Sequence, residues 1–370
     1  MRLGTTGVGQ SPVPARRVAI AMSGGVDSSV AAALLVEQGW PAVGVHMKLH
    51  TLPDEDRRDR SCCSIDDSLD ARQVCARLGI PFYVIDFTRE FEERVMNYFV
   101  EGYRAGRTPN PCVMCNQTVK NGLLLEKVRE FGCDYLATGH YAAIRWNAES
   151  GRHEIVKPKD RRKDQTYFLW GTPASELPFL LFPLANHEKP AARAEAARRQ
   201  LITWDKPDSQ EVCFVPGDYR DFLKKHLHES AVLPGNFVDR EGRVLGQHRG
   251  IPFYTVGQRR GLGLSGAEPW YVVAIRPESH QVVLGTEDEL LGATLRVSGV
   301  NWVSCEPPAG AMDALVKVRY AHAGTPARVT PTGPGKARVD FAAPVRAIAP
   351  GQAAVFYSGD VMLGGGWIES

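Results

Sequence analysis

The sequence predicts an α/β protein: a doubly wound parallel-sheet domain, then a small central domain, then a C-terminal antiparallel β-barrel. Short apolar runs alternate with helical patterns over the first part of the chain. A glycine turn follows the first apolar run directly, and beyond Pro234 short β-rich segments are separated by Gly and Pro turns. Alternating strands and helices indicate a parallel sheet, whereas short, evenly spaced strands indicate an antiparallel barrel.

The parallel sheet is expected to contain four strands with helices between them. After the second strand, apolar residues recur at helical spacing from Ala71 through Val74 and Cys75 to Leu78. The strands are expected at 18–22, 42–47, 82–85 and 135–138, and the helices at 29–37, around 71–78, from the third strand to about 102, near 120–131, at 189–199 and at 218–228. Ligands of such sheets bind at the carboxyl ends of the strands, so we look for a site there.

Length and composition divide the chain into several domains. With 370 residues, 44% of them hydrophobic and 23% charged, it is too long for one ordinary globular domain. We expect a loose leader at 1–16, the parallel-sheet domain at 17–215, the central domain at 216–285 and the barrel at 286–370. Strands beyond Pro234 are expected at 270–275, 281–284, 314–320, 337–341 and 353–357.

No segment has the pattern of a membrane span or a signal peptide. The best apolar run, 177–184, is short and interrupted by prolines, and residues 1–17 lack a hydrophobic core. We therefore expect a cytoplasmic protein with no membrane partner. No sequence feature reports the oligomeric state, and a monomer is the default expectation.

The string Ser23-Gly-Gly-Val-Asp-Ser-Ser29 lies between the first strand and the first helix. Gly24 and Gly25 permit close approach of an anion, and the helix start presents N–H groups to phosphate. The serine hydroxyls are further donors, and Asp27 is a candidate ligand for a Mg²⁺ that bridges phosphates. The plain alternative is a glycine turn capped by serine. The whole string resembles the PP-loop of the ATP-pyrophosphatase group, so we expect an ATP site, lined also by 138–141.

Eight cysteines in a cytoplasmic chain indicate metal or redox chemistry more than a disulfide scaffold. Cys112 and Cys115 form a CxxC in a proline-stiffened loop just before a helix, whose dipole stabilises a thiolate. A zinc half-site, a redox pair and a pair of cluster ligands are the alternatives, but no second CxxC or paired histidines complete a zinc site. Cys213 fits a reactive thiol or a core thiol, and the other five are interpreted as core thiols, with Cys62-Cys63 unexplained.

Two basic segments, 157–163 and 258–260, stand out although the net charge is only +2. Taken alone, such segments are usually solvated loops.

The pattern GxGxxG at 261–266 follows no strand and leads into Glu268-Pro269, so we reject it as a dinucleotide fingerprint. The absence of GxxxxGK[ST] from the sequence excludes ordinary P-loop kinases and GTPases.

Motifs along nearly the whole chain resemble, in the same order, those of the bacterial tRNA-specific 2-thiouridylase family. They are SGGVDSS at 23–29, Met47, TPNPxxxCN at 108–116, TGHY at 138–141, KDQTYFLW at 163–170, CF at 213–214, GQRRGLG at 257–263, PWYVV at 269–273, VRY at 318–320 and PGQAAVFY at 350–357. The resemblance implies a tRNA-uridine 2-sulfurtransferase that uses ATP and Mg²⁺. It adenylates the C2 oxygen of the wobble uridine, and sulfur then attacks C2. The implied partners are tRNA and a persulfide donor, either a cysteine desulfurase or a sulfur-relay protein.

The resemblance also implies residue roles. Cys213 would receive persulfide sulfur, and Cys115 would be the partner nucleophile that can form a disulfide with it. Nucleotide contacts are implied at Ala21, Met22, Ser23, Gly24, Gly25, Val26, Asp27, Ser28, Met47 and Gly139. Contacts with tRNA are implied at Lys163, Asp164, Gln165, Arg319 and Tyr320, and contacts near the target base at Asn110, Pro111 and Cys112. With this family in view, the basic segments are expected to contact tRNA.

One position departs from the family pattern, because Cys112 stands where the best-known members have aspartate. The thiols of Cys112, Cys115 and Cys213 could instead hold a 4Fe–4S cluster with one open iron. We favour the persulfide relay, since the family shares its two cysteines. A PP-loop amidating ligase and a tRNA-binding module that uses ATP only structurally are the alternatives, and pyrophosphate release distinguishes an adenylating enzyme from a binder.

Overall fold

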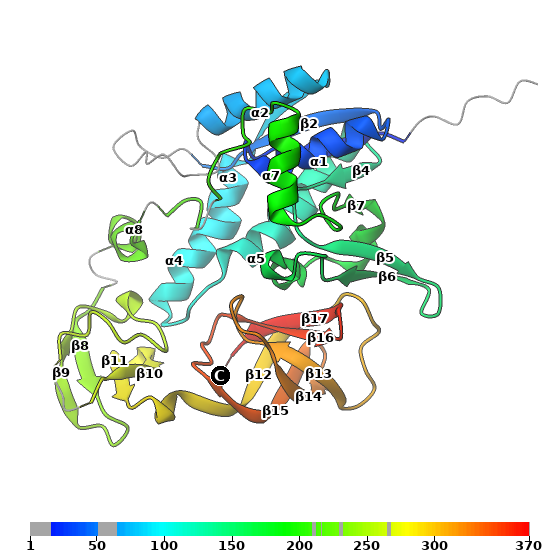
Figure 1. Ribbon diagram of the computed structural model, residues 1–370. Helices are drawn as coiled ribbons and strands as arrows, with labels where there is room; N and C mark the ends of the chain where they lie inside the picture. Colours follow the sequence, from blue (N-terminus) through cyan, green and yellow to red (C-terminus); the bar gives the residue numbers. More distant parts are fainter. Residues whose placement is uncertain are drawn as a thin grey trace, which may run out of the picture.

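The computed structural model describes residues 16–50, 65–208, 212–215, 217–228, 232–264 and 268–369. They form a parallel-sheet domain, a barrel below it and a small β-domain beside the barrel (Figure 1). The predicted fold class is confirmed. The expectations for the leader up to residue 15, for the polar stretch 52–61 and for Cys62-Cys63 lie outside the described residues.

The parallel sheet has five strands in the order β3-β2-β1-β4-β7. They are β1 (Val18–Ala21), β2 (Ala42–Lys48), β3 (Phe82–Asp86), β4 (Tyr135–Ala137) and β7 (Leu180–Leu181), all running parallel. The sequence did not predict β7, whose two residues are too few to show a strand pattern. The chain order changes direction between β1 and β4, and a crevice at their carboxyl ends is the usual ligand site of such a sheet.

Helices cover both faces of this sheet, and alternate residues of β1 show it. Val18 and Ile20 pack into one core cluster, while Ala19 packs into another. The first cluster includes residues of α1 (Val26–Glu37), α2 (Ile65–Leu78) and α7 (Lys189–Arg198). The second includes residues of α3 (Thr88–Phe91), η2 (Glu92–Met96), α4 (Asn97–Arg104), α5 (Pro111–Cys115), η3 (Asn116–Leu124) and α6 (Leu125–Glu130).

The helix that was predicted near 120–131 begins much earlier, at Pro111. Asn110 caps it, because its side-chain oxygen accepts a hydrogen bond from the N–H of Val113 at 3.2 Å. The expectation of a loop through 108–116 is therefore wrong for its second half. An Asn-Pro pair is itself a helix start, with asparagine at the N-cap and proline at the first helical position.

The central domain consists of α8 (Tyr219–His226) and a sheet in the order β10-β11-β8-β9. Its strands are β8 (Gly235–Val238), β9 (Val244–His248), β10 (Tyr271–Arg276) and β11 (Gln281–Gly285). The rejected GxGxxG pattern begins in this domain, where residues 261–264 belong to no strand or helix. The rest of the pattern includes 265 and 266, which are not among the described residues.

The barrel is closed by pairing of its first and last strands, β12 and β17. It comprises β12 (Leu291–Trp302), β13 (Met312–Lys317), β14 (Thr325–Gly333), β15 (Lys336–Arg346), β16 (Ala353–Ser358) and β17 (Val361–Ile368). A hairpin of the parallel-sheet domain, β5 (Ala143–Asn147) and β6 (Arg152–Val156), joins the same sheet where β6 pairs with β17. The barrel is thus continuous with the domain above it.

The glycines of β17 explain why the sequence did not predict this strand. A Cβ on Gly364 would lie 2.2 Å from the Asn301 carbonyl oxygen, and one on Gly365 would lie 2.9 Å from the Trp170 ring. Close packing therefore requires residues of low strand propensity.

The remaining short helices are η4 (Arg161–Lys163), η5 (Thr166–Leu169), η6 (Ala174–Phe179), η8 (Ile251–Phe253), η9 (Pro277–Ser279) and η10 (Asp288–Leu290). Among the described residues, no helix is long and apolar enough to span a membrane.

Candidate active site

The glycine loop after β1 is held in a shape that only glycine permits. Gly24 has φ +74°, and a Cβ there would lie 2.3 Å from the carbonyl oxygen of Asp67. From β4, Gly139 approaches the start of α1 so closely that a Cβ would lie 2.7 Å from the Ser28 nitrogen. The predicted loop and the predicted 138–141 segment therefore meet at the carboxyl ends of β1 and β4.

Serine hydroxyls shape the loop. Ser28 accepts the N–H of Ser23 at 3.2 Å and donates to the Gly25 carbonyl at 3.1 Å. The Ser29 hydroxyl is fully buried and donates to the same carbonyl at 2.8 Å. Ser29 therefore holds the loop from within, contrary to its predicted role as a phosphate donor, whereas Ser23 is exposed.

The Asp27 carboxylate is bound by a lysine that the sequence analysis missed. Both of its oxygens accept hydrogen bonds from the Lys189 ammonium, at 2.7 and 2.8 Å. The buried hydroxyl of Tyr141 donates to it as well, at 3.1 Å. Lys189 begins α7, far along the chain, and only the packing of α7 on α1 brings it to the loop.

Asp208 extends this network. It lies 2.8 Å from Lys189, 2.8 Å from Lys163 and 2.6 Å from Arg193. Burial opposes ionisation of Asp208, but hydrogen bonds from Lys163 and Lys189 outweigh it and lower the pKa of this carboxyl to about 2. Asp208 is therefore a carboxylate at neutral pH, and it ties residues that follow α7 to the nucleotide loop.

A second lysine that was missed, Lys206, braces the loop from the other side. Its ammonium donates to the Gly24 carbonyl at 3.1 Å and pairs with Asp67 at 2.6 Å and Asp70 at 2.7 Å. The two carboxylates belong to α2, so Lys206 links that helix to the loop. A lone lysine in a polar stretch carries no sequence signal for such a role.

The walls of the site come from the ends of β1 and β2. Ala21 is partly buried, and the buried Met22 donates its N–H to the Val45 carbonyl at 2.8 Å. Its own carbonyl lies 2.9 Å from Nδ1 of His46, an imidazole whose pKa is lowered by burial. Met47 is partly buried in the same strand, and Val26 is buried at the start of α1. The predicted nucleotide residues thus share one edge of the sheet.

The two predicted sulfur-handling cysteines pack on one core cluster. Cys115 is 7% exposed and belongs to it, and the half-buried Cys213 packs against it. Phe214 anchors the second cysteine, since its ring lies 5.5 Å from the centroid of Phe91. His50, just beyond β2, is buried beside the backbone of Cys213, and burial lowers its pKa. Cys213 therefore lies near the end of β2, next to the strand that carries the loop.

Cys112 is exposed in the first turn of α5. Among residues 16–50, 65–208 and the later described segments, no three His, Cys, Asp or Glu side chains are grouped as metal ligands. No disulfide joins any of the cysteines in the described part of the chain. Burial raises the pKa of Cys75 to about 12 and that of the half-buried Cys305 to about 11.

The predicted tRNA-contacting residues come from two domains and meet. Tyr320 of the barrel is 39% exposed, and its ring lies 4.7 Å from that of Phe168, next to the 163–165 segment. Arg319 donates to the Arg346 carbonyl at 2.9 Å. Asp164 is different, because it is buried and accepts the N–H and the hydroxyl of Thr166 at 3.0 and 2.6 Å.

Gln165 and Asn110 also make internal hydrogen bonds. The Gln165 side chain accepts the N–H of Tyr141 at 2.8 Å, which joins the 163–165 segment to the nucleotide site. Asn110 is the helix cap described above, with Pro111 buried behind it. For both residues, sequence alone could not separate a fold-holding role from an RNA-contacting one.

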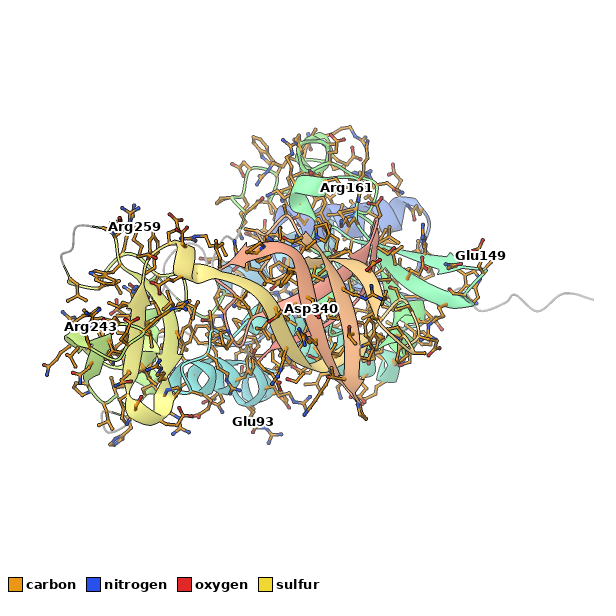
Figure 2. The ribbon with its side chains drawn as sticks, turned by 90° about the horizontal axis from the view of Figure 1, so that it is seen from below. Glu93, Glu149, Arg161, Arg243, Arg259 and Asp340 are labelled. Carbon is orange, nitrogen blue, oxygen red and sulfur yellow. The ribbon has the colours of Figure 1, made fainter. Side chains whose placement is uncertain are left out.

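The two basic segments lie apart. Figure 2 shows the exposed Arg161 on the parallel-sheet domain and Arg259 on the central domain, well separated. Part of the first segment serves tertiary structure, because Arg161 pairs with Asp360 at 2.6 Å and Lys157 donates to the Gly359 carbonyl at 3.3 Å. Those contacts fix the segment to the turn between β16 and β17.

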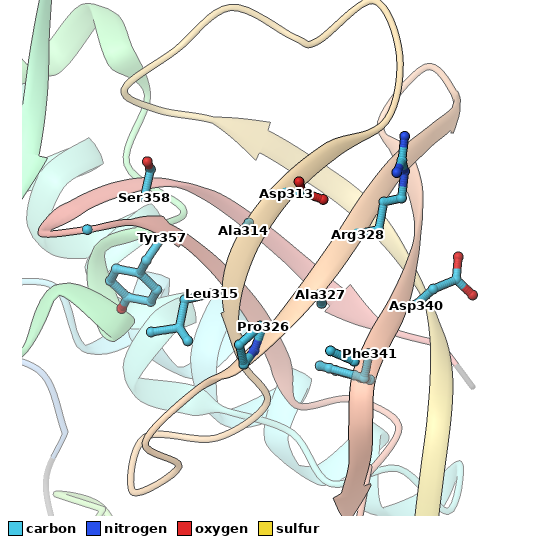
Figure 3. Close-up of a pocket in the computed structure, with 12 residues that line it drawn as sticks. Asp313, Ala314, Leu315, Pro326, Ala327, Arg328, Asp340, Phe341, Tyr357 and Ser358 are labelled. Atoms are coloured by element: carbon cyan, nitrogen blue, oxygen red, sulfur yellow. The ribbon is translucent and has the colours of Figure 1, made fainter.

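A depression of about 520 Å³ on the barrel is separate from this site. Figure 3 shows its lining residues on β13, β14, β15 and β16, among them Leu315, Pro326 and Tyr357. None of the predicted nucleotide residues lines it. The charged and glycine-lined edge of the parallel sheet is therefore the candidate site.

Comparisons with known proteins match the chain over most of its length. Residues 16–217 match the family described as the tRNA methyl transferase HUP domain, 220–286 its PRC-barrel domain, and 292–368 the aminomethyltransferase beta-barrel domain. A tRNA-specific 2-thiouridylase MnmA from Carboxydothermus hydrogenoformans is 48% identical over 96% of this chain and 98% of its own length. The protein of the same name from Solibacter usitatus is 45% identical over 96% of this chain and 100% of its own.

A weaker structural likeness, with a TM-score of 0.34 and 17% identity, relates 59% of the chain to 81% of an NMN synthetase from Francisella tularensis. The 2-thiouridylases, in contrast, match over almost their entire length. This chain therefore belongs to the tRNA-specific 2-thiouridylase family of sulfurtransferases.

Proposed function

We propose that this chain transfers sulfur to C2 of the wobble uridine of tRNA, at the cost of ATP, which leaves as AMP and pyrophosphate. The placement of residues 206–208 and 212–215 is the observation that carries this proposal. Lys206 binds the Gly24 carbonyl, Asp208 shares Lys189 with Asp27, and Cys213 follows against the end of β2. Residues that are close in sequence thus contact the ATP loop and carry a half-buried thiol.

In the activation step, the C2 oxygen attacks the α-phosphorus of ATP and pyrophosphate leaves. The N–H groups at the start of α1 bind phosphate, and the glycines allow it to come close. Asp27 fits a ligand of Mg²⁺ bound together with phosphate oxygens, since Mg²⁺ sites in nucleotide enzymes often use one or two carboxylates. The adenylated oxygen is a good leaving group, which makes C2 electrophilic.

In the sulfur step, the terminal sulfur of a persulfide on Cys213 attacks C2, and AMP leaves with the oxygen. The Cys115 thiolate then attacks the Cys213 sulfur, which forms a Cys115–Cys213 disulfide and leaves both electrons of the broken S–S bond on the thiouridine sulfur. A thiol reductant must reduce this disulfide before the next cycle. A cysteine desulfurase or a sulfur-relay protein supplies the persulfide.

The route through a 4Fe–4S cluster requires Cys112 as a third ligand. Cys112 is exposed, Cys115 is buried a turn later in the same helix, and the three thiols are not gathered as ligands in the described structure. The relay needs only Cys115, which is buried, and Cys213, which is half-buried. This favours the relay, with Cys112 outside the chemistry.

Binding of tRNA is assigned to the surface where the domains meet. Tyr320 and Phe168 offer aromatic faces, and Lys163 and Arg319 offer positive charge, which suits an RNA loop whose base is splayed from its stack. We assign the exposed Arg161 and Arg259 to tRNA phosphates. The protein acts as a cytoplasmic monomer in this scheme.

A single-turnover assay tests the proposal. Protein loaded with ³⁵S persulfide is mixed with tRNA and ATP, and labelled tRNA and pyrophosphate are measured. Cys213→Ser is expected to abolish label transfer but keep pyrophosphate release. Cys115→Ser is expected to trap label in a protein–tRNA adduct that dithiothreitol releases.

The control is Cys112→Ser, which is expected to transfer label like the unmodified protein. If Cys112→Ser instead loses both bound iron and activity, the cluster route replaces the relay. Pyrophosphate release without any tRNA thiolation would favour an amidating ligase, and no pyrophosphate at all would favour a binding module.

A further inference from the structure

Lys189 is a buried cation whose position is fixed at three points. Its side chain is 9% exposed and contacts both Asp27 oxygens and Asp208, all within 2.8 Å. Its backbone N–H donates to the Asp160 carboxylate at 3.0 Å. Because α7 packs on α1 through Ala192 and Ala196, the ammonium is held beside the first turn of α1.

Charges of both signs surround this ammonium. Lys189, Lys163 and Arg193 supply three positive charges, whereas Asp27 and Asp208 supply two negative ones. The Asp160 carboxylate, which accepts the Lys189 N–H at 3.0 Å, balances the third positive charge, so the feature that favours an anion here is the N-terminus of α1 beside these side chains. A buried ion pair adds little stability compared with apolar packing of the same volume. The presence of buried ion pairs at this position therefore indicates a functional role more than a stabilising one.

We propose that Lys189 binds the β- and γ-phosphates of ATP, the part that leaves as pyrophosphate. When phosphate enters, the flexible lysine transfers its hydrogen bonds from Asp27 to phosphate oxygens. Asp27 is then released for a cation bound with the nucleotide. Negative charge grows on the leaving pyrophosphate during adenylation, and a cation placed there stabilises that charge. The inference rests on the proposed use of ATP but not on sulfur transfer.

Calorimetric titration of the full chain with pyrophosphate and with AMP, without Mg²⁺, tests the assignment. Lys189→Met is expected to weaken pyrophosphate binding by about 10- to 100-fold, the range for a lost hydrogen bond to a charged group. AMP lacks the β- and γ-phosphates, so its affinity is expected to change by less than about 3-fold. Equal losses for both ligands, or no loss for either, would overturn the proposal.

Two further variants distinguish direct contact between Lys189 and phosphate from a general change in local charge. Lys159→Met removes an exposed lysine paired with Glu188 at 3.6 Å, immediately before Lys189, and is expected to bind both ligands normally. The double variant Asp27→Asn with Lys189→Met tests whether an exposed Asp27 carboxylate merely repels the anion. Pyrophosphate binding is expected to stay weak in this double variant, and full recovery would contradict direct contact.

A crystal structure of the unmodified protein with pyrophosphate covers the case in which the variants do not fold. The Lys189 nitrogen is expected within about 3.2 Å of a phosphate oxygen. Retention of its pairs with Asp27 and Asp208, with no phosphate contact, would reject the assignment. Selective pyrophosphate binding through Lys189 in a protein that never thiolates tRNA would refute the proposed function and leave this inference standing.

Discussion

Single residues around the nucleotide loop fix its conformation through close contacts. Gly24 combines a left-handed backbone with a contact that no side chain could make, and Lys206 binds the carbonyl of the same residue. The loop is therefore held from the α2 side before any ligand arrives. A preformed loop avoids part of the entropy cost of ordering on binding.

Replacing Gly24 by alanine is expected to destabilise the protein and abolish ATP binding. A left-handed φ costs an alanine about 1–2 kcal/mol, and the overlap with the Asp67 carbonyl adds about 1–3 kcal/mol of overpacking. Gly39→Ala is the matched control, since Gly39 has φ +82° with nothing within 4 Å of its Cβ position. Urea unfolding measures both variants, and equal losses would refute the role of the contact.

His46 makes the stability of the protein depend on pH. Its pKa is lowered by burial, so the folded state holds it neutral. Below about pH 6.5 the unfolded chain binds a proton that the folded protein excludes, so the stability present above that pH is lost as pH falls. His46→Gln is expected to reduce the slope of unfolding free energy against pH, by up to about 1.4 kcal/mol per pH unit. Urea titrations at pH 7.5 and 5.5 check this, and an unchanged slope would contradict it.

Among the elements, the helix that starts at Pro111 determines where the thiols lie. Its first turn carries Cys112 to the surface, and one turn later Cys115 enters the core. The N-cap of Asn110 fixes the start of this helix, and its position therefore sets which cysteine faces solvent. The helix continues through a π-helical stretch, η3, before α6.

Loss of the Asn110 cap is expected to lower stability and loosen the cysteines together. Asn110→Ala should cost about 1 kcal/mol in unfolding free energy, the usual value for an N-cap, and should speed alkylation of Cys115. Asn110→Asp keeps the acceptor and should behave like the unmodified protein in both measurements. If Asn110→Asp is stable but fails to thiolate tRNA, the side chain also has a role at the base.

At the scale of the whole molecule, the barrel and the parallel-sheet domain form one unit. The β5–β6 hairpin extends the barrel sheet, the rings of Trp170 and Trp367 meet edge to face at 5.1 Å, and Asn301 donates to the carbonyls of Trp170 and Thr172 at 2.8 and 2.9 Å. Such docking keeps Tyr320 in register with Phe168. The surface assigned to tRNA is thus fixed in the free protein.

Unfolding of these two domains is expected to be a single transition. Tryptophan fluorescence and far-UV circular dichroism should therefore give coincident urea curves. Asn301→Ala leaves two carbonyls without this donor and should shift both curves together, by about 1–3 kcal/mol. Two separate transitions, or a shift in only one probe, would show that the barrel is an independent unit.

The sequence allowed much of the site to be predicted, because its chemistry lies in local strings. SGGVDSS identified the loop, and the placement of Gly139 at the end of the fourth strand was confirmed by its contact with Ser28. Strands rich in glycine, such as β17, and very short ones, such as β7, were missed because local propensity does not report packing. The helix start at Pro111 was readable from Asn-Pro but was interpreted as a loop.

By itself, the sequence determined the fold class, the family and the glycine loop, because strand alternation, glycine at tight turns and ordered motifs are properties of neighbouring residues. Only the tertiary structure decided which distant charges meet. It placed Lys189 between Asp27 and Asp208, and Lys206 on Gly24, and it turned Asp164 and Ser29 inward. An ion pair depends on distance in space, and the packing of α7 on α1, which sets that distance, leaves no trace at the level of neighbouring residues.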